Sequence, residues 1–269
     1  MEEEMSFWDH LDALRSVLFK SIAVVFIFAI AFFLIMPSIF DSVILAPCYS
    51  DFYLYSWLCK INEYIAILPD FCSQSFRVDV ININMAAQFF THMSISFWLG
   101  VVFAFPVIIY ELWTFISPAL YENEKKNVRW AFLFGNIMFF AGVAVGYFVV
   151  FPLTLRFLAG YQLSEAITNQ INLSSYMDTF LMLVLVMGIV FELPLLCWML
   201  SGMGLITRSF FSKYRRYAIV AILVAAAIIT PSSDPFTLMV VFLPLYILYE
   251  FSALIVKPDE PEEPDELAV

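Results

Sequence analysis

The chain has 269 residues, of which 62% are hydrophobic and 14% are charged, and its mean hydropathy is +0.88. This composition excludes an ordinary soluble globular domain, in which about 25% of residues are charged. The net charge of −11 is local, because acidic residues gather at Glu2, Glu3 and Glu4 and again in residues 258–266. No basic face is present for phosphates, which excludes nucleic-acid binding.

Six long apolar runs predict an all-α polytopic membrane protein. About 20 apolar residues cross the roughly 30 Å hydrocarbon layer as a helix. The fifth run is short, at about 13 residues, and is expected to cross only part of the bilayer. The predicted spans are residues 17–36, 93–116, 130–151, 176–200, 217–229 and 236–256.

These spans define a transmembrane domain at residues 17–256. A cytoplasmic segment at 1–16 precedes it, and an acidic tail at 257–269 follows it. Tracts rich in Glu and Pro bury little apolar surface, so both ends are expected to be solvated and the tail disordered. Repulsion of anionic lipid, or attraction of a basic partner, is the alternative role for these ends.

Basic residues predict the orientation, because Lys and Arg mark cytoplasmic joins. Ten of the thirteen lie before the first span, after the second and fourth spans, or after the last. The opposite side holds only Lys60, Arg77 and Arg156. Both termini are therefore expected in the cytoplasm, which six crossings satisfy. A cleavable signal peptide is not expected, because the start is acidic and the first run is too long.

A long external loop, at about residues 37–90, follows the first span. Apolar residues at helical spacing over 52–68 predict a short helix across the outer ends of the bundle, with a loosely ordered loop as the alternative. Residues 76–85 alternate weakly, which favours an extended segment. Cys48, Cys59 and Cys72 lie in this loop, so at most one disulfide joins two of them, and which two stays open.

The sequence lacks the patterns of common catalytic sites. The two histidines, His10 and His92, are predicted on opposite sides of the membrane, which excludes a multi-histidine metal site. Motifs of zinc proteases, serine hydrolases, aspartyl proteases and phosphate loops are absent from the sequence. We therefore expect neither an enzyme nor a cofactor.

Glu192 is the most informative residue within the predicted spans. It lies about two-thirds of the way along the fourth span, where a carboxylate facing hydrocarbon costs at least about 2.5 kcal/mol. Pro194 frees the carbonyl of Val190 and predicts a kink. The pattern fits a polar notch that draws water into the bilayer, or a kink glutamate bonded to a neighbouring helix. Glu111 and Glu250 lie nearer the cytoplasmic ends, where snorkelling lowers the cost.

A second candidate group lies in residues 113–126, between the second and third spans. Phe115 ends an apolar helix, and Glu122 and Glu124 precede the bases of the next helix. Carboxylates backed by an aromatic ring can bind a peptide guanidinium in paired geometry. On physical grounds alone the simpler interpretation is that both glutamates offset the macrodipole of the third helix.

This segment closely resembles the TatC family, the receptor core of the twin-arginine translocase. The same resemblance extends, in the right order and spacing, to residues 7–15 (FWDHLDALR), 146–152 (GYFVVFP), 191–194 (FELP) and 230–236 (TPSSDPF). It covers the chain from residue 6 to about 256. The resemblance implies six helices in a concave, glove-like bundle in the bacterial cytoplasmic (inner) membrane.

The resemblance also implies a function and partners. Such a protein binds twin-arginine signal peptides of folded precursors at the cytoplasmic face. It assembles with single-span proteins of the TatA and TatB type and forms a homo-oligomer within the complex, surrounded by membrane lipids. By position, Glu124 corresponds to the glutamate that contacts the two arginines, Phe115 to an aromatic residue of the same site, and Glu192 to an intramembrane glutamate.

The remaining candidate residues follow from these assignments. The signal-peptide site is expected to comprise Leu11, Asp12, Arg15, Phe115, Glu122 and Glu124. Partner contacts within the membrane are expected at Glu192, Tyr147 and Asp234, and Pro47 and Phe89 are characteristic positions of the external region.

Two positions depart from the family pattern. Ala13 stands where the family has a glutamate, which removes a carboxylate from the arginine site, and Asp12 lies about 100° around the helix from it. Leu238 stands where the family has a glutamine after the last external turn. The alternative function is an ion-coupled secondary transporter using Glu192 and Glu111. It is disfavoured because the sequence shows no internal repeat and no paired broken helices.

Overall fold

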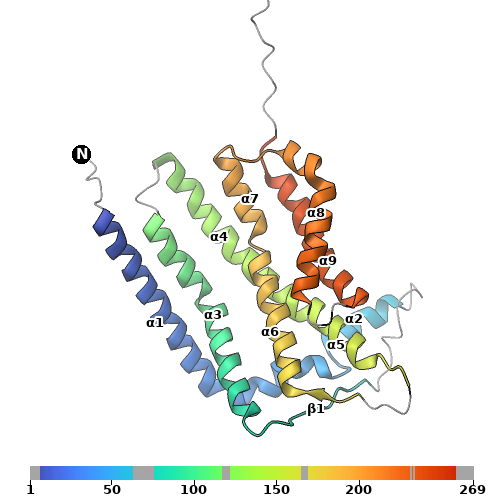
Figure 1. Cartoon of the computed structure of the whole chain (residues 1–269). Coiled ribbons are helices and arrows are strands. Elements are labelled where there is room, and N and C mark those ends of the chain that lie inside the picture. The colour runs from blue at the N-terminus through green and yellow to red at the C-terminus, as the bar shows by residue number, and fades with distance from the viewer. Residues whose placement is uncertain are drawn as a thin grey trace, which may run out of the picture.

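The computed structural model describes residues 7–62, 76–116, 122–164, 169–230, 232 and 234–258. Helices dominate this part of the chain (Figure 1). In chain order the elements are α1 (Phe7–Ile39), η1 (Phe40–Ile44), η2 (Ala46–Cys48), α2 (Tyr53–Asn62), β1 (Val80–Ile81), α3 (Ala87–Ile116), α4 (Glu122–Val145), η4 (Gly146–Val150), α5 (Phe151–Gly160), β2 (Ile171–Asn172), α6 (Leu173–Val190), α7 (Leu193–Gly202), α8 (Arg208–Ile229) and α9 (Pro235–Ile255).

Five helical segments of the described chain are long and apolar enough to cross a membrane. They coincide with the first four predicted spans and the sixth, and they cover Leu11–Cys48, Ala87–Phe115, Phe132–Gly160, Leu173–Gly202 and Pro235–Ile255. α8 does not qualify, because four basic residues lie in its first half. With 22 residues it is nevertheless longer than the apolar run at 217–229 from which a span was predicted.

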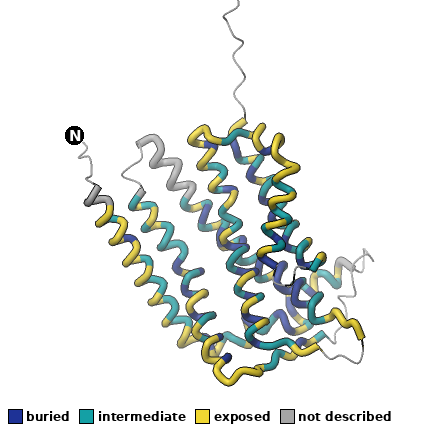
Figure 2. The backbone as a smooth tube through the Cα atoms, in the orientation of Figure 1, coloured by how far each residue is buried: buried dark blue, intermediate teal, exposed yellow. Residues whose placement is uncertain are grey.

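The helices form a bundle with two distinct ends (Figure 1). The basic end is where α1 begins, α3 ends, α4 begins, α8 begins and α9 ends. The capped end is where η1, α2, β1 and β2 lie (Figure 1). α1 packs along α3, and Gly100 permits this approach, because a Cβ there would lie 2.8 Å from the backbone nitrogen of Ala29. The buried core centres on α5 and α6, whereas α1 is largely exposed (Figure 2).

Prolines explain most of the helix breaks. α6 ends at Val190, residues 191 and 192 form a turn, and α7 begins at Leu193 with Pro194 in its first turn. The predicted break at Pro194 is therefore confirmed. Between α4 and α5 the chain passes through the π-helical turn η4, and Pro152 follows directly in the first turn of α5. Proline has no N–H to donate, so both places release a carbonyl from the helical ladder.

Tyrosine hydroxyls hold the capped end together. Tyr147 donates a hydrogen bond of 2.7 Å to the carbonyl of Val43, and Tyr176 donates to that of Ile44. The hydroxyl of Tyr55, on α2, lies 3.0 Å from the carbonyls of both Pro47 and Pro152. These hydrogen bonds join η1 to η4 and α6, and they join α2 to η2 and α5.

The external loop is partly structured, as predicted. The expected helix is present as α2, and the rest of its predicted range, 63–68, lies outside the described residues. The expected extended segment contains β1, which pairs with β2 in parallel, with Val80 opposite Ile171. Cys59 is disulfide-bonded to a residue outside the described part of the chain, while Cys48 is a buried free thiol.

Candidate functional site

An ion pair joins α1 to α3 near the basic end. Lys20 Nζ lies 3.2 Å from Glu111 Oε2, and the side chain of Glu111 is only 15% exposed. Glu111 was expected to reduce the energetic cost of its charge in the membrane by snorkelling. In the structure, Lys20 of the neighbouring helix compensates that charge instead. Since Phe115 follows Glu111 by one helical turn, this contact also fixes the end of α3 relative to the start of α1.

The predicted signal-peptide residues gather at the basic end. Leu11, Asp12 and Arg15 are exposed in the first turns of α1, and the Arg15 guanidinium lies 5.5 Å from the centre of the Phe19 ring. Phe115 is half-buried at the end of α3. Figure 1 shows the start of α4 at the same end.

Glu122 is the first residue of α4, and Glu124 lies in its first turn. Their side chains, and that of His10, lie outside the described residues. The two glutamates therefore occupy the helix start that the macrodipole interpretation requires.

Glu192 lies in the turn between α6 and α7 and faces α4. A Cβ built on Gly135 would lie 3.2 Å from Glu192 Oε2, so the carboxylate sits directly against the α4 backbone. Glu192 Oε1 and Asn136 Oδ1 are both buried without a hydrogen-bond partner among the described residues. Buried polar atoms are nearly always paired in native proteins, so this site has capacity for water or for a polar group from outside the chain.

Sequence reasoning missed Gly135, the α4 position that Glu192 faces, and Asn136, which follows it in the chain. Asn136 donates a 2.8 Å bond to the carbonyl of Phe132, which leaves its Oδ1 available. The pair Gly135 and Asn136 interrupts an otherwise apolar run in the third predicted span, and this interruption is the signal that could have found them. Sequence reasoning also missed the partners of Glu250. Its carboxylate accepts hydrogen bonds from Arg215 and Tyr246, each at 2.7 Å.

Tyr147 and Asp234, both expected at partner contacts, have clear structural roles. Tyr147 is the hydroxyl that binds the Val43 carbonyl. Asp234 caps α9: its Oδ1 accepts from the Thr237 N–H at 2.8 Å, and its Oδ2 accepts from the Ser232 hydroxyl at 2.6 Å. Partial burial acts to raise the pKa of Asp234, but the hydrogen bonds from Ser232 and Thr237 prevail and hold the pKa below its usual value.

Replacing Asp234 with alanine should lower the free energy of unfolding by about 1 kcal/mol at pH 7, the usual cost of losing an N-cap. Since the pKa is lower in the folded state, the cap stabilises at neutral pH and is lost as the pH falls through the folded-state pKa. Melting temperatures at pH 7 and pH 3 in detergent, with Asp234→Asn as the control that retains capping, would measure this. An equal loss at both pH values would contradict it.

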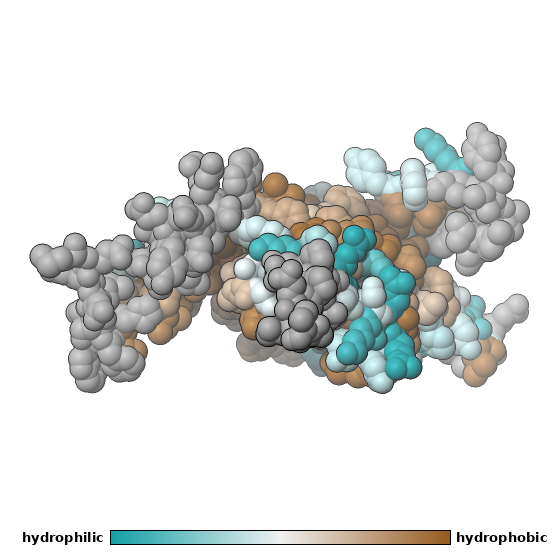
Figure 3. Space-filling view, turned by 90° about the horizontal axis from the view of Figure 1, so that it is seen from above, coloured by the Kyte–Doolittle hydropathy of each residue, from teal (hydrophilic) through white to brown (hydrophobic). Residues whose placement is uncertain are grey.

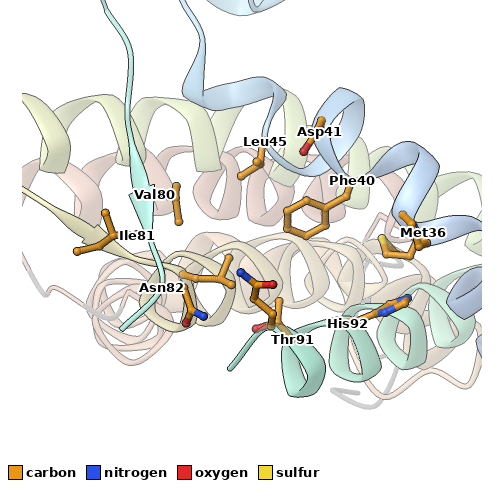
Figure 4. Close-up of a pocket in the computed structure, with 12 residues that line it drawn as sticks. Met36, Phe40, Asp41, Leu45, Val80, Ile81, Asn82, Thr91 and His92 are labelled. Carbon is orange, nitrogen blue, oxygen red and sulfur yellow. The ribbon is translucent and has the colours of Figure 1, made fainter. Parts of the chain in front are cut away.

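The capped end contains a pocket of about 460 Å³ bounded by α1, η1, β1 and α3. Figure 4 shows His92 and Thr91 of α3 on one wall, with Phe40 and Asp41 of η1 on the other. His92 Nε2 lies 2.8 Å from the carbonyl of Phe33, which Pro37 leaves without its helical N–H. The ring of His92 also stacks on Phe33, with centroids 4.0 Å apart.

The other two predicted external positions have different surroundings. Pro47 is buried beneath Tyr55, whereas Phe89 is exposed at the start of α3 and contacts Phe90 edge-on. No group of three or more His, Cys, Asp or Glu residues able to hold a metal ion occurs in the described part of the chain. The expectation of no cofactor therefore stays a prediction.

The chain was compared with known proteins. Residues 9–244 match the model of the family described as Sec-independent protein translocase protein (TatC). The TatC protein of Blattabacterium sp. is 33% identical over 255 residues, which cover 94% of this chain and 96% of the relative. The TatC protein of Helicobacter pylori strain J99 is 39% identical over 196 residues, which cover 73% of this chain and 78% of the relative.

Solved structures show the same similarity. The crystal structure of the twin-arginine translocase receptor TatC superposes with a TM-score of 0.69 at 30% identity, over 91% of this chain and 97% of that one. A second crystal structure of this receptor, in DDM, gives a TM-score of 0.72 at 30% identity, over 92% and 99%. The chain therefore belongs to the TatC family of Sec-independent protein translocase proteins, multi-pass subunits of the bacterial inner membrane that transport proteins and are not enzymes.

Proposed function

We propose that this chain is the receptor and scaffold subunit of its translocase and binds twin-arginine signal peptides at the basic end. The observation that carries the proposal is the placement of three segments at one end of the bundle: the α1 start with exposed Leu11, Asp12 and Arg15, the α3 end with half-buried Phe115, and the α4 start with Glu122 and Glu124. The carboxylates supply paired acceptors for guanidinium groups, and the aromatic ring supplies an apolar wall.

Six crossings with both termini in the cytoplasm complete this proposal. α8 supplies the sixth crossing, although its basic residues make it too polar to be recognised as a span by composition. These residues lie at the basic end, beside the end of α9, because the Arg208 N–H donates to the Lys257 carbonyl. Cytoplasmic loops are the ones enriched in Lys and Arg, which places the basic end in the cytoplasm. Signal peptides approach from that side.

Glu192 provides the second functional element. Its buried, unpartnered Oε1 marks a polar notch in the concave bundle, where the carboxylate accepts water or a polar side chain of a single-span partner of the TatA or TatB type. Several copies of the chain assemble with these partners into the translocase. The membrane potential or proton gradient drives transport, because the sequence contains no nucleotide-binding motif.

Co-purification with a synthetic signal peptide tests the receptor role. The purified chain should retain a peptide with Arg-Arg and release the same peptide with Lys-Lys, because only guanidinium groups bind carboxylates in a bidentate fashion. Equal retention of both peptides would contradict guanidinium recognition and leave only charge attraction.

Replacing Glu192 with alanine should reduce crosslinking of the partner helix to α6 and α7 by about tenfold, because a charge-assisted hydrogen bond contributes roughly 1.5–3 kcal/mol. Site-specific crosslinking in membranes measures this. Asp178→Asn is the matched control, since Asp178 is an exposed carboxylate on α6, the helix that precedes Glu192. Unchanged crosslinking in the Glu192 variant would favour a glutamate that serves only the α6–α7 turn.

The transporter alternative receives less support from the structure. Glu111, one of the two carboxylates it would use, is paired with Lys20 and is not available as a carrier group. Uptake of small solutes into vesicles that contain only this chain would reverse the preference.

A further inference from the structure

The first half of α8 exposes cations that no described acidic residue neutralises. Arg208, Lys213 and Arg216 are exposed, and none of them forms an ion pair within the described part of the chain. Arg215, by contrast, turns toward α9 and pairs with Glu250 at 2.7 Å. The bundle therefore uses one of the four bases for its own packing and leaves three facing outward.

Aromatic and hydroxyl groups surround these outward cations. Lys213 Nζ lies 5.8 Å from the centre of the Tyr214 ring, and the Arg216 guanidinium lies 5.1 Å from that of Tyr217. Both rings are exposed, as is Ser212, one turn before Arg216. Exposed tyrosines beside basic residues are typical of a helix at the level of lipid headgroups.

An apolar strip continues from the cations along the same side of α8. Val220, Val224 and Ile228 follow Arg216 at intervals of four residues and are 59%, 55% and 73% exposed. Residues at this spacing share one face of a helix. The α8 face, defined as Lys213, Arg216, Val220, Val224 and Ile228, is therefore cationic at the basic end and apolar beyond it.

The surface view agrees with this description. Figure 3, which looks down on the basic end, shows hydrophilic side chains gathered over the α7–α9 part of the bundle beside strongly hydrophobic ones. Cations beside an apolar strip complement a phospholipid with a negative headgroup, because the cations can bind the phosphate and the strip can contact an acyl chain.

We propose that the α8 face binds an anionic glycerophospholipid. Its phosphate lies between Lys213 and Arg216, within reach of the Ser212 hydroxyl, and one acyl chain lies along Val220, Val224 and Ile228. A zwitterionic headgroup fits less well, because its amine would meet the two cations of the α8 face. The acidic C-terminal residues of the chain match the charge but cannot cover the apolar strip, since residues 258–266 are all Pro, Asp or Glu.

This inference is independent of twin-arginine recognition, because the α8 face shares no residue with the proposed signal-peptide site. It requires only that the basic end lies at a membrane surface.

Titration of the purified full chain with phosphatidylglycerol or phosphatidylcholine of identical acyl chains tests it, with bound lipid counted by native mass spectrometry. Phosphatidylglycerol should bind at least fivefold more tightly than phosphatidylcholine. The double variant Lys213→Gln/Arg216→Gln should lower the affinity for phosphatidylglycerol by about fivefold for each charge removed. It should leave the affinity for phosphatidylcholine unchanged. Lys213→Arg/Arg216→Lys should retain binding, and Lys60→Gln, an exposed base on α2 at the capped end, should have no effect.

Three results would overturn the proposal. Equal affinity for the two lipids would remove the role of headgroup charge. If glycerol 3-phosphate displaced the lipid at an equal concentration, the site would bind anions without any contribution from an acyl chain. Lipid binding that appears only after residues 259–269 are deleted would show that the acidic C-terminal residues are the true occupant of the α8 face.

Discussion

Replacing Glu124 with alanine should weaken binding of an Arg-Arg signal peptide by about ten- to a hundredfold. A hydrogen bond to a charged group contributes roughly 1.5–3 kcal/mol, and every 1.4 kcal/mol is a factor of ten in affinity. The effect should be large in this chain, because Ala13 stands where the family resemblance places a second glutamate. Fluorescence anisotropy of a labelled peptide with the purified wild-type and variant chains would measure this change in affinity.

The control variants separate recognition from general electrostatics. Asp51→Asn removes an exposed carboxylate from the capped end and should not change binding. Glu124→Asp keeps the charge but shortens the side chain, so its affinity should lie between those of the wild type and the alanine variant. If Glu124→Ala bound the peptide as tightly as the wild type, Glu124 would serve only the macrodipole of α4, and Asp12 would become the leading acceptor.

Replacing Gly142 with alanine should lower the free energy of unfolding by about 3 kcal/mol, the upper part of the range for overpacking. A Cβ at this position would lie 2.5 Å from the Met187 carbonyl oxygen and 2.7 Å from the Phe191 Cβ. The Met187 oxygen belongs to the backbone of α6, so α4 and α6 must move apart. Because Phe191 precedes Glu192, the same movement should displace the polar notch.

Gly160→Ala is the matched control for Gly142→Ala, because no atom would lie within 4 Å of the new Cβ. Thermal unfolding in detergent should show a melting temperature several degrees lower for Gly142→Ala and unchanged for Gly160→Ala. Equal melting temperatures for the two variants would mean that the helices separate at no cost.

Five of the spans and the break at Pro194 could be predicted from the sequence because their causes are local. Apolar length predicted the helices, and Pro194 predicted the division between α6 and α7. α8 shows the limit of this reasoning: its apolar run is short, but its helix also includes a basic first half, in which Arg215 bonds to Glu250 on α9. A contact between two helices is invisible to a window that moves along one of them.

The candidate site divides in the same way. Glu192 was identified because a carboxylate in an apolar run is conspicuous, but Gly135, the position that it faces, lies on another helix and emerged only with the fold. Lys20 and Glu111 are 91 residues apart, so nothing local connects them. The roles of Glu122 and Glu124 remain proposals that rest on the family resemblance and on their position at the start of α4.

The contact between His92 and the Phe33 carbonyl has a consequence for how the protein is made. Pro37 removes the N–H that this carbonyl would otherwise receive from its own helix. If the first helix entered the bilayer alone, it would leave that oxygen without a donor in hydrocarbon, at a cost of several kcal/mol. During biogenesis the first two crossings thus lower their energy by inserting as a hairpin, with the imidazole of the second crossing completing the backbone of the first.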